Sequence, residues 1–588
     1  MDKYKKFMYI GIFILLISLV SSAGTYAWFT WISPSNTSVT LSIGNLADVT
    51  FTSGPDINIS NLAPVYNYTD GVSTTFTVRN TNSTDSLLYK VKLEITSIAN
   101  ELKDESFKYT LLKDNKVVKT GNLKDAINGN TLILNTSSLD KGSTSSPKIS
   151  TFKLYFWIDG NMENNSNMMN KSLVGKIDVG VETNVITNTE SSISSTSKFL
   201  NTEVPRQNIK TLKYVDNLNI PEGATVVDVS KNGDNTIKMW YNEADANGNY
   251  DITIGSNNTI YANPSGSNLF SNLTNVTSID LSNMDTSGIV GMNGMFENDK
   301  VLTNIVFGDN FNTSNATNMT AMFRGCNNLT ELDLRMFDTS NVKSMYNMFA
   351  ESGIKNVNLS SFVTHNLDGG GMQRMFFNCT KLESLDLSSF DTSSITNFEK
   401  IFYHCTSLKS LNVSNFNTSN VTNFYDMFNG CSSLKELDVS GFDTSKAVIM
   451  GNMFSGCSSL ESLDVSHFNT SNVKTMSDMF SSLKCSLDLS NFDTSNVDNL
   501  SRMFMYYKNE RLDLSSFDTS KVTSTNHMFA SSSIEYIDLR NADFSNVTDY
   551  TNMFKGISKS TIIYLKDTTG NRNFMNTNFN NITATYIS

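Results

Sequence analysis

Cysteine and histidine are the residue types of this chain best suited to nucleophilic, redox or metal chemistry. There are six cysteines and four histidines in 588 residues. Five of the cysteines follow a phenylalanine by three residues, and Cys485 stands outside this phase. The five in-phase residues are Cys326, Cys379, Cys405, Cys431 and Cys457. A disulfide needs converging Cβ atoms, whereas neighbouring copies of a repeat present them in parallel. No C-x-x-C motif or paired histidine supplies a zinc-ligand set. Buried free thiols are therefore predicted.

The histidines do not fall into a catalytic pattern. His365, His404, His467 and His527 occupy four different phases of the repeat described below, which places them on different faces. Serine, threonine and aspartate are abundant because they belong to the repeat's turns, so they give a Ser-His-Asp arrangement no separate support. The widest irregularity, residues 362–376, offers one histidine and one aspartate. We predict that the chain is not an enzyme.

Aspartate recurs at one phase of the repeat. The candidate ligand-binding residues are Asp333, Asp386, Asp438, Asp464, Asp488, Asp513 and Asp538. Both neighbours of each are apolar and point inward from a strand, so the aspartate faces outward. Carboxylates stacked about 4.8 Å apart repel one another. Two interpretations stay open: a solvated polar face, or a face that contacts a cation such as calcium, or a ligand. No other cofactor is predicted. Outward serines extend the polar face: Ser360, Ser388, Ser414, Ser440, Ser466, Ser490 and Ser515.

A repeat of 24 to 27 residues must position these side chains. The stretch MFNGCSSLKELDVSGFDTS at 427–445 recurs in similar form, and Met-Phe or a close variant marks each copy. Within one copy, Leu434, Leu437 and Val439 predict a strand, Phe442 a buried corner, and the following apolar spacing a short helical return. The regular period predicts stacked units. The predicted fold is mainly β with short helices: a solenoid with a parallel sheet.

The consensus MFxxCxxLxxLDLSxFDTSxVxxM resembles the BspA-like leucine-rich-repeat surface proteins. The resemblance covers about residues 269–565. It implies a leucine-rich-repeat solenoid in a bacterial surface or secreted protein, in a family of which some members act in adhesion to host or matrix proteins.

Residues 33–185 alternate apolar and polar side chains in several short runs, which predicts an antiparallel β-sandwich. The hairpin signal KDNK stands at 113–116. The segments AGTYAWFT (23–30), LSIGNL (41–46) and FWIDGN (156–161) resemble camelysin/TasA-type biofilm-matrix proteins. That family usually carries an acidic residue soon after the Phe, where Thr30 and Trp31 stand here. The resemblance implies export and a role in a matrix.

The N-terminus predicts export. Lys3, Lys5 and Lys6 precede the apolar stretch Phe7–Val20, as in a signal peptide. The apolar stretch also extends far enough, from 7 to 32, to serve as an uncleaved membrane anchor. The expected domains are a signal peptide or anchor (1–32), the β-sandwich (33–185), a linker (186–207), an N-terminal cap (208–268) and the solenoid with its C-terminal cap (269–588).

Composition limits the partners. The net charge is −12 and the pI about 5.0, which disfavours nucleic acid because phosphate binding needs clustered basic residues. We expect an exported cell-surface protein that binds an extracellular protein or glycan through the solenoid. The alternative is a structural matrix or fibre component that self-assembles through the β-sandwich. A membrane would be contacted only through the N-terminal segment.

Overall fold

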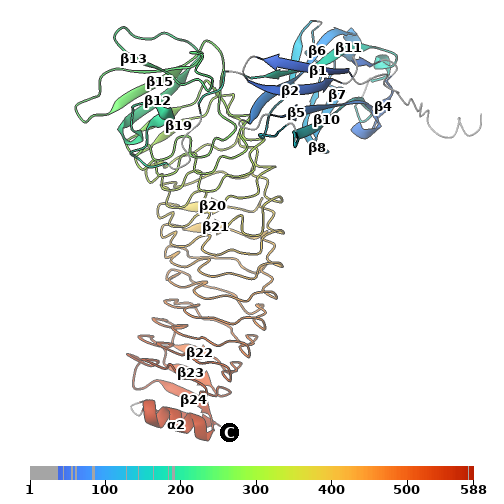
Figure 1. Ribbon diagram of the computed structural model, residues 1–588. Helices are drawn as coiled ribbons and strands as arrows, with labels where there is room; N and C mark the ends of the chain where they lie inside the picture. Colours follow the sequence, from blue (N-terminus) through green and yellow to red (C-terminus); the bar gives the residue numbers. More distant parts are fainter. Residues whose placement is uncertain are drawn as a thin grey trace, which may run out of the picture. The chain divides into compact units, whose positions relative to one another are not determined.

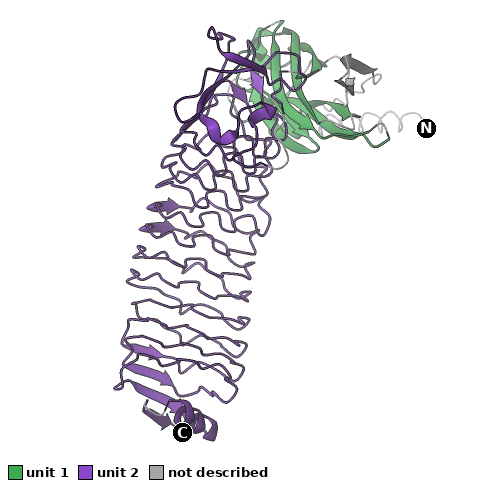
Figure 2. Ribbon diagram, turned by 60° about the vertical axis from the view of Figure 1, so that its left-hand side comes forward, with its two compact units in different colours: residues 1–182 green, residues 183–588 purple. Residues whose placement is uncertain are grey.

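The protein is described from a computed structural model. It divides into two compact units, residues 1–182 and 183–588, each considered by itself (Figure 2). The structure describes residues 37–43, 46–53, 57–59, 62–81, 86–127, 129–143, 145–162, 165–182, 184–187, 193–579 and 582–587. The predicted signal or anchor at 1–32 therefore lies outside the described residues.

The first unit contains two sheets (Figure 1). Their side chains form one hydrophobic cluster. One sheet has the order β1 (Thr37–Ile43), β2 (Leu46–Ser53), β5 (Val72–Asn80), β10 (Lys148–Asp159), β7 (Phe107–Lys113) and β8 (Lys116–Asn122), with β4 (Pro64–Val65) beside β10. The other has the order β3 (Ile57–Ile59), β11 (Leu173–Val181), β6 (Leu87–Ile98) and β9 (Thr131–Leu139). The pairs are antiparallel except β4 with β10.

Alternating side chains build this core, as the sequence predicts. Phe76 of β5 and Phe152 of β10 stack with ring centroids 5.1 Å apart, and Tyr89 of β6 meets Phe152 edge-on. The predicted hairpin is confirmed, because β7 and β8 pair antiparallel across Asp114 and Asn115. Both turn residues have positive φ, which asparagine and aspartate tolerate better than most residues.

The second unit begins with a cap of longer strands. Its sheet has the order β13 (Thr225–Asp228), β14 (Lys238–Tyr241), β15 (Tyr250–Gly255), β12 (Ile209–Val215), β17 (Ser278–Asp280) and β19 (Asn304–Val306). Two short strands, β16 (Ile260–Tyr261) and β18 (Met284–Asp285), form a separate parallel sheet. Strands β12, β17 and β19 run parallel, so the cap leads directly into the repeat.

The expected linker at 186–207 is wrong for its described part. Ile186 pairs with Ser230, and Phe199 is fully buried in the core of the second unit. Arg206 is also buried, and it donates hydrogen bonds to the carbonyl oxygens of Leu269 and Ser271. The Ser/Thr-rich composition predicted a linker, but a few apolar side chains and one arginine fix the segment to the cap.

The remainder of the second unit is a stack of parallel turns (Figure 1). Parallel bridges connect equivalent residues of successive turns, for example from Asn423 to Ile449, Thr475 and Asn499. Regular strands occur at β20 (Ser384–Asp386), β21 (Ser410–Asn412), β22 (Arg511–Asp513), β23 (Tyr536–Leu539), β24 (Ile562–Lys566) and β25 (Ala584–Ile587). The helix α2 (Thr569–Asn578) follows β24, with Phe574 and Met575 buried. The expected parallel arrangement is confirmed, but the regular strands fall into separate sheets, β20–β21 and β22–β25.

The predicted helical return is wrong. In the described turns of the repeat, the segment around Met-Phe is a run of reverse turns without helix. The residue before each Met-Phe pair has positive φ, as Asp426 and Asn452 do, and so does the residue two after the phenylalanine, as Gly430 does. Hydrogen bonds alternate accordingly: Met427 N–H donates within its own turn, and Phe428 N–H donates to Met453 in the next turn. The i, i+3, i+6 spacing fits this pattern as well as a helix.

Short 3₁₀ helices are confined to the cap and the first unit among the described residues. They are η1 (Tyr68–Asp70), η2 (Asn100–Leu102), η3 (Asn165–Met168), η4 (Phe199–Asn201) and η5 (Arg206–Asn208).

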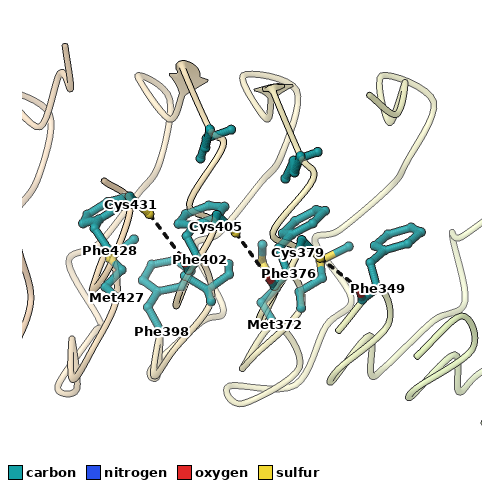
Figure 3. Packing of buried hydrophobic residues seen from close by; sticks show 14 of the residues in the cluster. Phe349, Met372, Phe376, Cys379, Phe398, Phe402, Cys405, Met427, Phe428 and Cys431 are labelled. Atoms are coloured by element: carbon teal, nitrogen blue, oxygen red, sulfur yellow. Dashed lines mark hydrogen bonds between the residues drawn. The ribbon is translucent and has the colours of Figure 1, made fainter. Parts of the chain in front are cut away.

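Aromatic rings and thiols form the core of the stack (Figure 3). Phe402 stacks on Phe376 at 5.9 Å and on Phe428 at 5.6 Å between ring centroids. The prediction that the cysteines are buried is confirmed for all six. Each in-phase thiol donates to a phenylalanine carbonyl of the preceding turn; Cys431, for example, lies 3.2 Å from the Phe402 oxygen. Burial raises the pKa of Cys379 and of Cys431 to about 12, so these thiols are unreactive in the folded state.

Candidate binding face of the repeat

The seven candidate aspartates occupy the same position in their turns, directly after the inward leucine or isoleucine. Together they are called the Asp face. Six of them are exposed: Asp333, Asp386, Asp438, Asp464, Asp488 and Asp513. Asp538 differs, because this residue is buried, with 2% of its surface exposed. It forms an ion pair with Arg540, which shields the carboxylate from solvent. The prediction that this position faces solvent is therefore wrong at Asp538.

A local turn occupies one oxygen of each exposed carboxylate. Asp438 Oδ1 accepts the backbone N–H of Ser440 at 2.9 Å, and Asp464 Oδ1 accepts that of Ser466 at 3.0 Å. The asparagines at the same phase do likewise, since Asn412 Oδ1 accepts from Ser414 N–H at 3.2 Å. The aspartates are thus explained in part as turn-forming residues. In Asp438 and Asp464 the turn engages Oδ1 and leaves Oδ2 at the outer surface, whereas both oxygens of Asp333 accept hydrogen bonds from Arg335.

These hydrogen bonds keep the aspartates ionised. The hydroxyl and backbone N–H of the following serine lower the pKa of Asp438, Asp464 and Asp488. Arg335 donates side-chain hydrogen bonds to Asp333 and lowers its pKa to about 2. This stabilisation offsets the repulsion expected between stacked carboxylates. The Asp face consequently carries its negative charge at neutral pH.

A groove of about 590 Å³ opens on the Asp face near Asp386. It is lined by Asn356, Val357, Asn358, Leu359, Ser360, Ser384, Leu385, Asp386, Ser388, Ser389, Ser410 and Asn412. Strand β20 pairs with β21, but residues 356–358 form no strand. Val357 follows its phenylalanine by eight residues, whereas Leu385 and Leu411 follow theirs by nine. The groove lies where this turn, which forms no strand, meets the paired strands β20 and β21.

A ladder of buried threonines holds the turns at fixed positions, and sequence reasoning missed it. Thr444 Oγ1 donates to the carbonyl of Asn469 in the next turn at 3.0 Å and accepts its N–H at 2.8 Å. The same donation recurs at Thr286, Thr313, Thr339, Thr364, Thr392, Thr418, Thr470, Thr494 and Thr519. The sequence contains one signal for this ladder. The third position of the F-D-T-S segment is threonine in copy after copy, although a turn alone would accept serine there as well.

Asparagines reach in the opposite direction. Asn472 Nδ2 donates to the Ser445 carbonyl of the preceding turn at 2.8 Å, and Asn496 contacts Ser471 in the same way. The sequence T-S-N therefore encodes one contact to the following turn and one to the preceding turn. Paired side chain–backbone contacts of this kind fix the register of the stack.

The described residues show no metal cluster and no candidate catalytic pair. No group of three His, Cys, Asp or Glu residues in the described part of the chain is arranged to hold a metal ion. His365, His404 and His467 are exposed at separate turns, and His527 contacts Asn526 and Asn552. A calcium ion on the Asp face would meet one carboxylate per turn. Whether calcium binds there stays a prediction.

No helix within the described residues is both long and apolar enough to cross a bilayer.

A stack of parallel turns with a periodic aromatic core defines this chain as a repeat protein. Three successive and overlapping matches, to residues 265–370, 370–487 and 461–566, identify its family, described as "Mycoplasma protein of unknown function, DUF285". The chain belongs to this family. No curated protein and no solved structure matches the chain.

Proposed function

We propose that this protein is an exported surface protein that binds an extracellular protein or glycan through the Asp face of its repeat. The observation that carries the proposal is the groove at Asp386 on this polar face. We also propose that the repeat is, more specifically, a leucine-rich-repeat solenoid of the BspA-like type. Binding without catalysis is proposed, because the polar side chains of this face recur from turn to turn and do not form a site of dissimilar groups.

The hydrogen bonds between successive turns support a binding role. The threonine and asparagine contacts between turns fix the backbone, as between Thr444 and Asn469. A ligand that contacts several turns would therefore meet side chains already held at fixed spacing. Binding to a preorganised surface avoids part of the ordering cost that weakens association.

A structural role in a matrix or fibre is the second candidate, with the first unit as a TasA/camelysin-like β-sandwich. Strand β8 is an edge of its sheet, and Val117 on it is 50% exposed. Ile133 of the edge strand β9 and Ile149 of β10 are also exposed, at 44% and 52%. Exposed edges with apolar side chains favour association between chains. Lys116 and Lys119 on β8 oppose it by placing charge on the edge.

The proposed location is the bacterial cell surface, by secretion or by an N-terminal membrane anchor. This proposal depends on Lys3, Lys5 and Lys6 followed by the apolar stretch to residue 32. Mass spectrometry of the protein recovered from cells and medium would decide between a cleaved and a retained N-terminus.

Competition between the two units tests the proposed function. Each unit has its own hydrophobic cluster, so fragments 37–182 and 184–588 should each fold. The second fragment must include residues 193–207, because Phe199 and Arg206 belong to its core. Labelled full-length protein is bound to an extracellular surface preparation, with and without calcium. We expect fragment 184–588 to compete and fragment 37–182 not to compete. Competition by the first fragment alone, or its assembly into fibres, would support the matrix role.

A further inference from the structure

The groove on the Asp face differs in charge from the rest of that face. From Asp438 to Asp513 the column holds four carboxylates in succession, Asp438, Asp464, Asp488 and Asp513. At the groove the same column reads Asn358, Asp386 and Asn412. Asp386 is the one charged side chain among the twelve residues that line the groove. A basic partner would therefore be attracted to the carboxylates beyond the groove, and an acidic ligand would be repelled by Asp386.

Donors and acceptors alternate along the groove. Asn358 Oδ1 accepts Ser360 N–H at 3.0 Å, and Asp386 Oδ1 accepts Ser388 N–H at 2.9 Å. These bonds orient the side chains so that amide donors lie on either side of a carboxylate acceptor. The backbone N–H and hydroxyl of Ser388 lower the pKa of Asp386, and the nearby Asn412 side chain lowers it further. Serine hydroxyls, which both donate and accept, complete the rim.

The groove lining is mostly polar, with Val357 as its half-buried apolar residue. Val357, Leu359 and Leu385 belong to its lining, and Leu385 is a core residue at 4% exposure. Hydroxyls, amides and one carboxylate beside the half-buried Val357 match a ligand that has many hydroxyls and some C–H surface. A sugar ring has this character, since its hydroxyls pair with carboxylates and amides while its C–H groups contact apolar carbon.

On the basis of the proposed function, we propose that this groove binds a neutral oligosaccharide. The ligand class is an uncharged polyhydroxyl chain, and its contacts are with Asn358, Asp386 and Asn412 on three successive turns. The four-carboxylate stretch from Asp438 to Asp513 is not part of this site.

An oligosaccharide array tests the proposal with the full-length chain. Immobilised neutral hexose oligomers are compared with uronate-containing and sulfated oligomers of similar length. Ser384→Trp fills the groove, and Ser389→Trp fills it from a second exposed lining residue. Ser462→Trp is the matched control, because Ser462 also precedes an inward leucine, is exposed and lies outside the groove. Thermal melting checks that all variants are folded.

We expect a neutral oligomer to bind, with at least about tenfold weaker binding in the two groove variants and no change in Ser462→Trp. Binding of acidic oligomers only, or neutral binding that both groove variants retain, would overturn the inference. If no oligosaccharide binds while a surface preparation is still captured by fragment 184–588, the sugar assignment is wrong and the proposed function stands. If that fragment captures nothing, the proposed function itself fails.

Discussion

Replacement of Thr444 by valine tests the threonine ladder directly. The change keeps the side-chain shape but removes the hydroxyl that both donates to and accepts from the backbone of Asn469. Thr444 is 2% exposed, so water cannot readily replace these partners. Two hydrogen bonds at about 0.5–1.5 kcal/mol each predict a loss of about 1–3 kcal/mol in local stability.

Hydrogen exchange is the suitable assay, because a chain with two units and many turns does not unfold in one step. Loss of about 1–3 kcal/mol corresponds to exchange that is about 5- to 150-fold faster in peptides covering residues 440–475. Thr444→Ser keeps the hydroxyl and should cost about 1 kcal/mol through its lost methyl group. Thr422→Val is the control, since Thr422 is exposed and its hydroxyl donates only one long hydrogen bond, 3.4 Å, to the Thr396 carbonyl. If hydrogen exchange is equally fast in Thr444→Val and Thr422→Val, the threonine ladder does not stabilise the stack.

Three further predictions concern the turns, the thiols and the aspartates. Gly430→Ala should destabilise its turn by about 1–2 kcal/mol, because Gly430 has φ +76° and a Cβ there would lie 2.4 Å from His404 Cδ2; an equal effect in Gly370→Ala, where a Cβ meets only the flexible Gln373 side chain, would contradict this. The six cysteines should resist a thiol reagent at pH 8 and all react in denaturant, because burial raises the pKa of these thiols; rapid labelling of the folded chain would show that they are accessible. The pKa of Asp438 and of Asp464 is lowered in the folded state, so their contribution to stability is complete above the unfolded pKa near 4 and lost as the pH falls through the folded values. Hydrogen exchange of residues 436–466 should accelerate between pH 5 and pH 2, after correction for the intrinsic rate, and the acceleration should be smaller in Asp464→Asn; an unchanged acceleration would assign it to other groups.

The stacking of the repeat could be predicted because its period, its buried phenylalanines and its cysteine phase depend only on neighbouring copies. The return segment could not be assigned correctly, since the spacing of Phe424, Met427 and Phe428 suits either a helix or consecutive reverse turns. Positive φ at Asp426 and Gly430 decides for turns, and that choice depends on hydrogen bonds to the next copy.

The Asp face was predicted as a column, but its groove was not. The groove forms where residues 356–358, which make no strand, meet strands β20 and β21, and the repeat spacing alone does not show which turns pair as strands. Asp538 was placed at the surface by its phase, whereas the nearby Arg540 covers it. Composition predicts a linker at Phe199 and Arg206, because it does not show that a distant part of the chain supplies their partners.

A comparison of blocked faces tests the central claim that ligands bind to the Asp face. Tryptophan is introduced on that face at Ser384, Ser410 or Ser462, and on the return segment at Lys474 or Asp498, all of them exposed. Retention of the full-length variants on an extracellular surface preparation is then measured. Binding through the Asp face predicts that at least one of the first three substitutions weakens retention and that the last two do not. Weakening by Lys474→Trp or Asp498→Trp alone would contradict it.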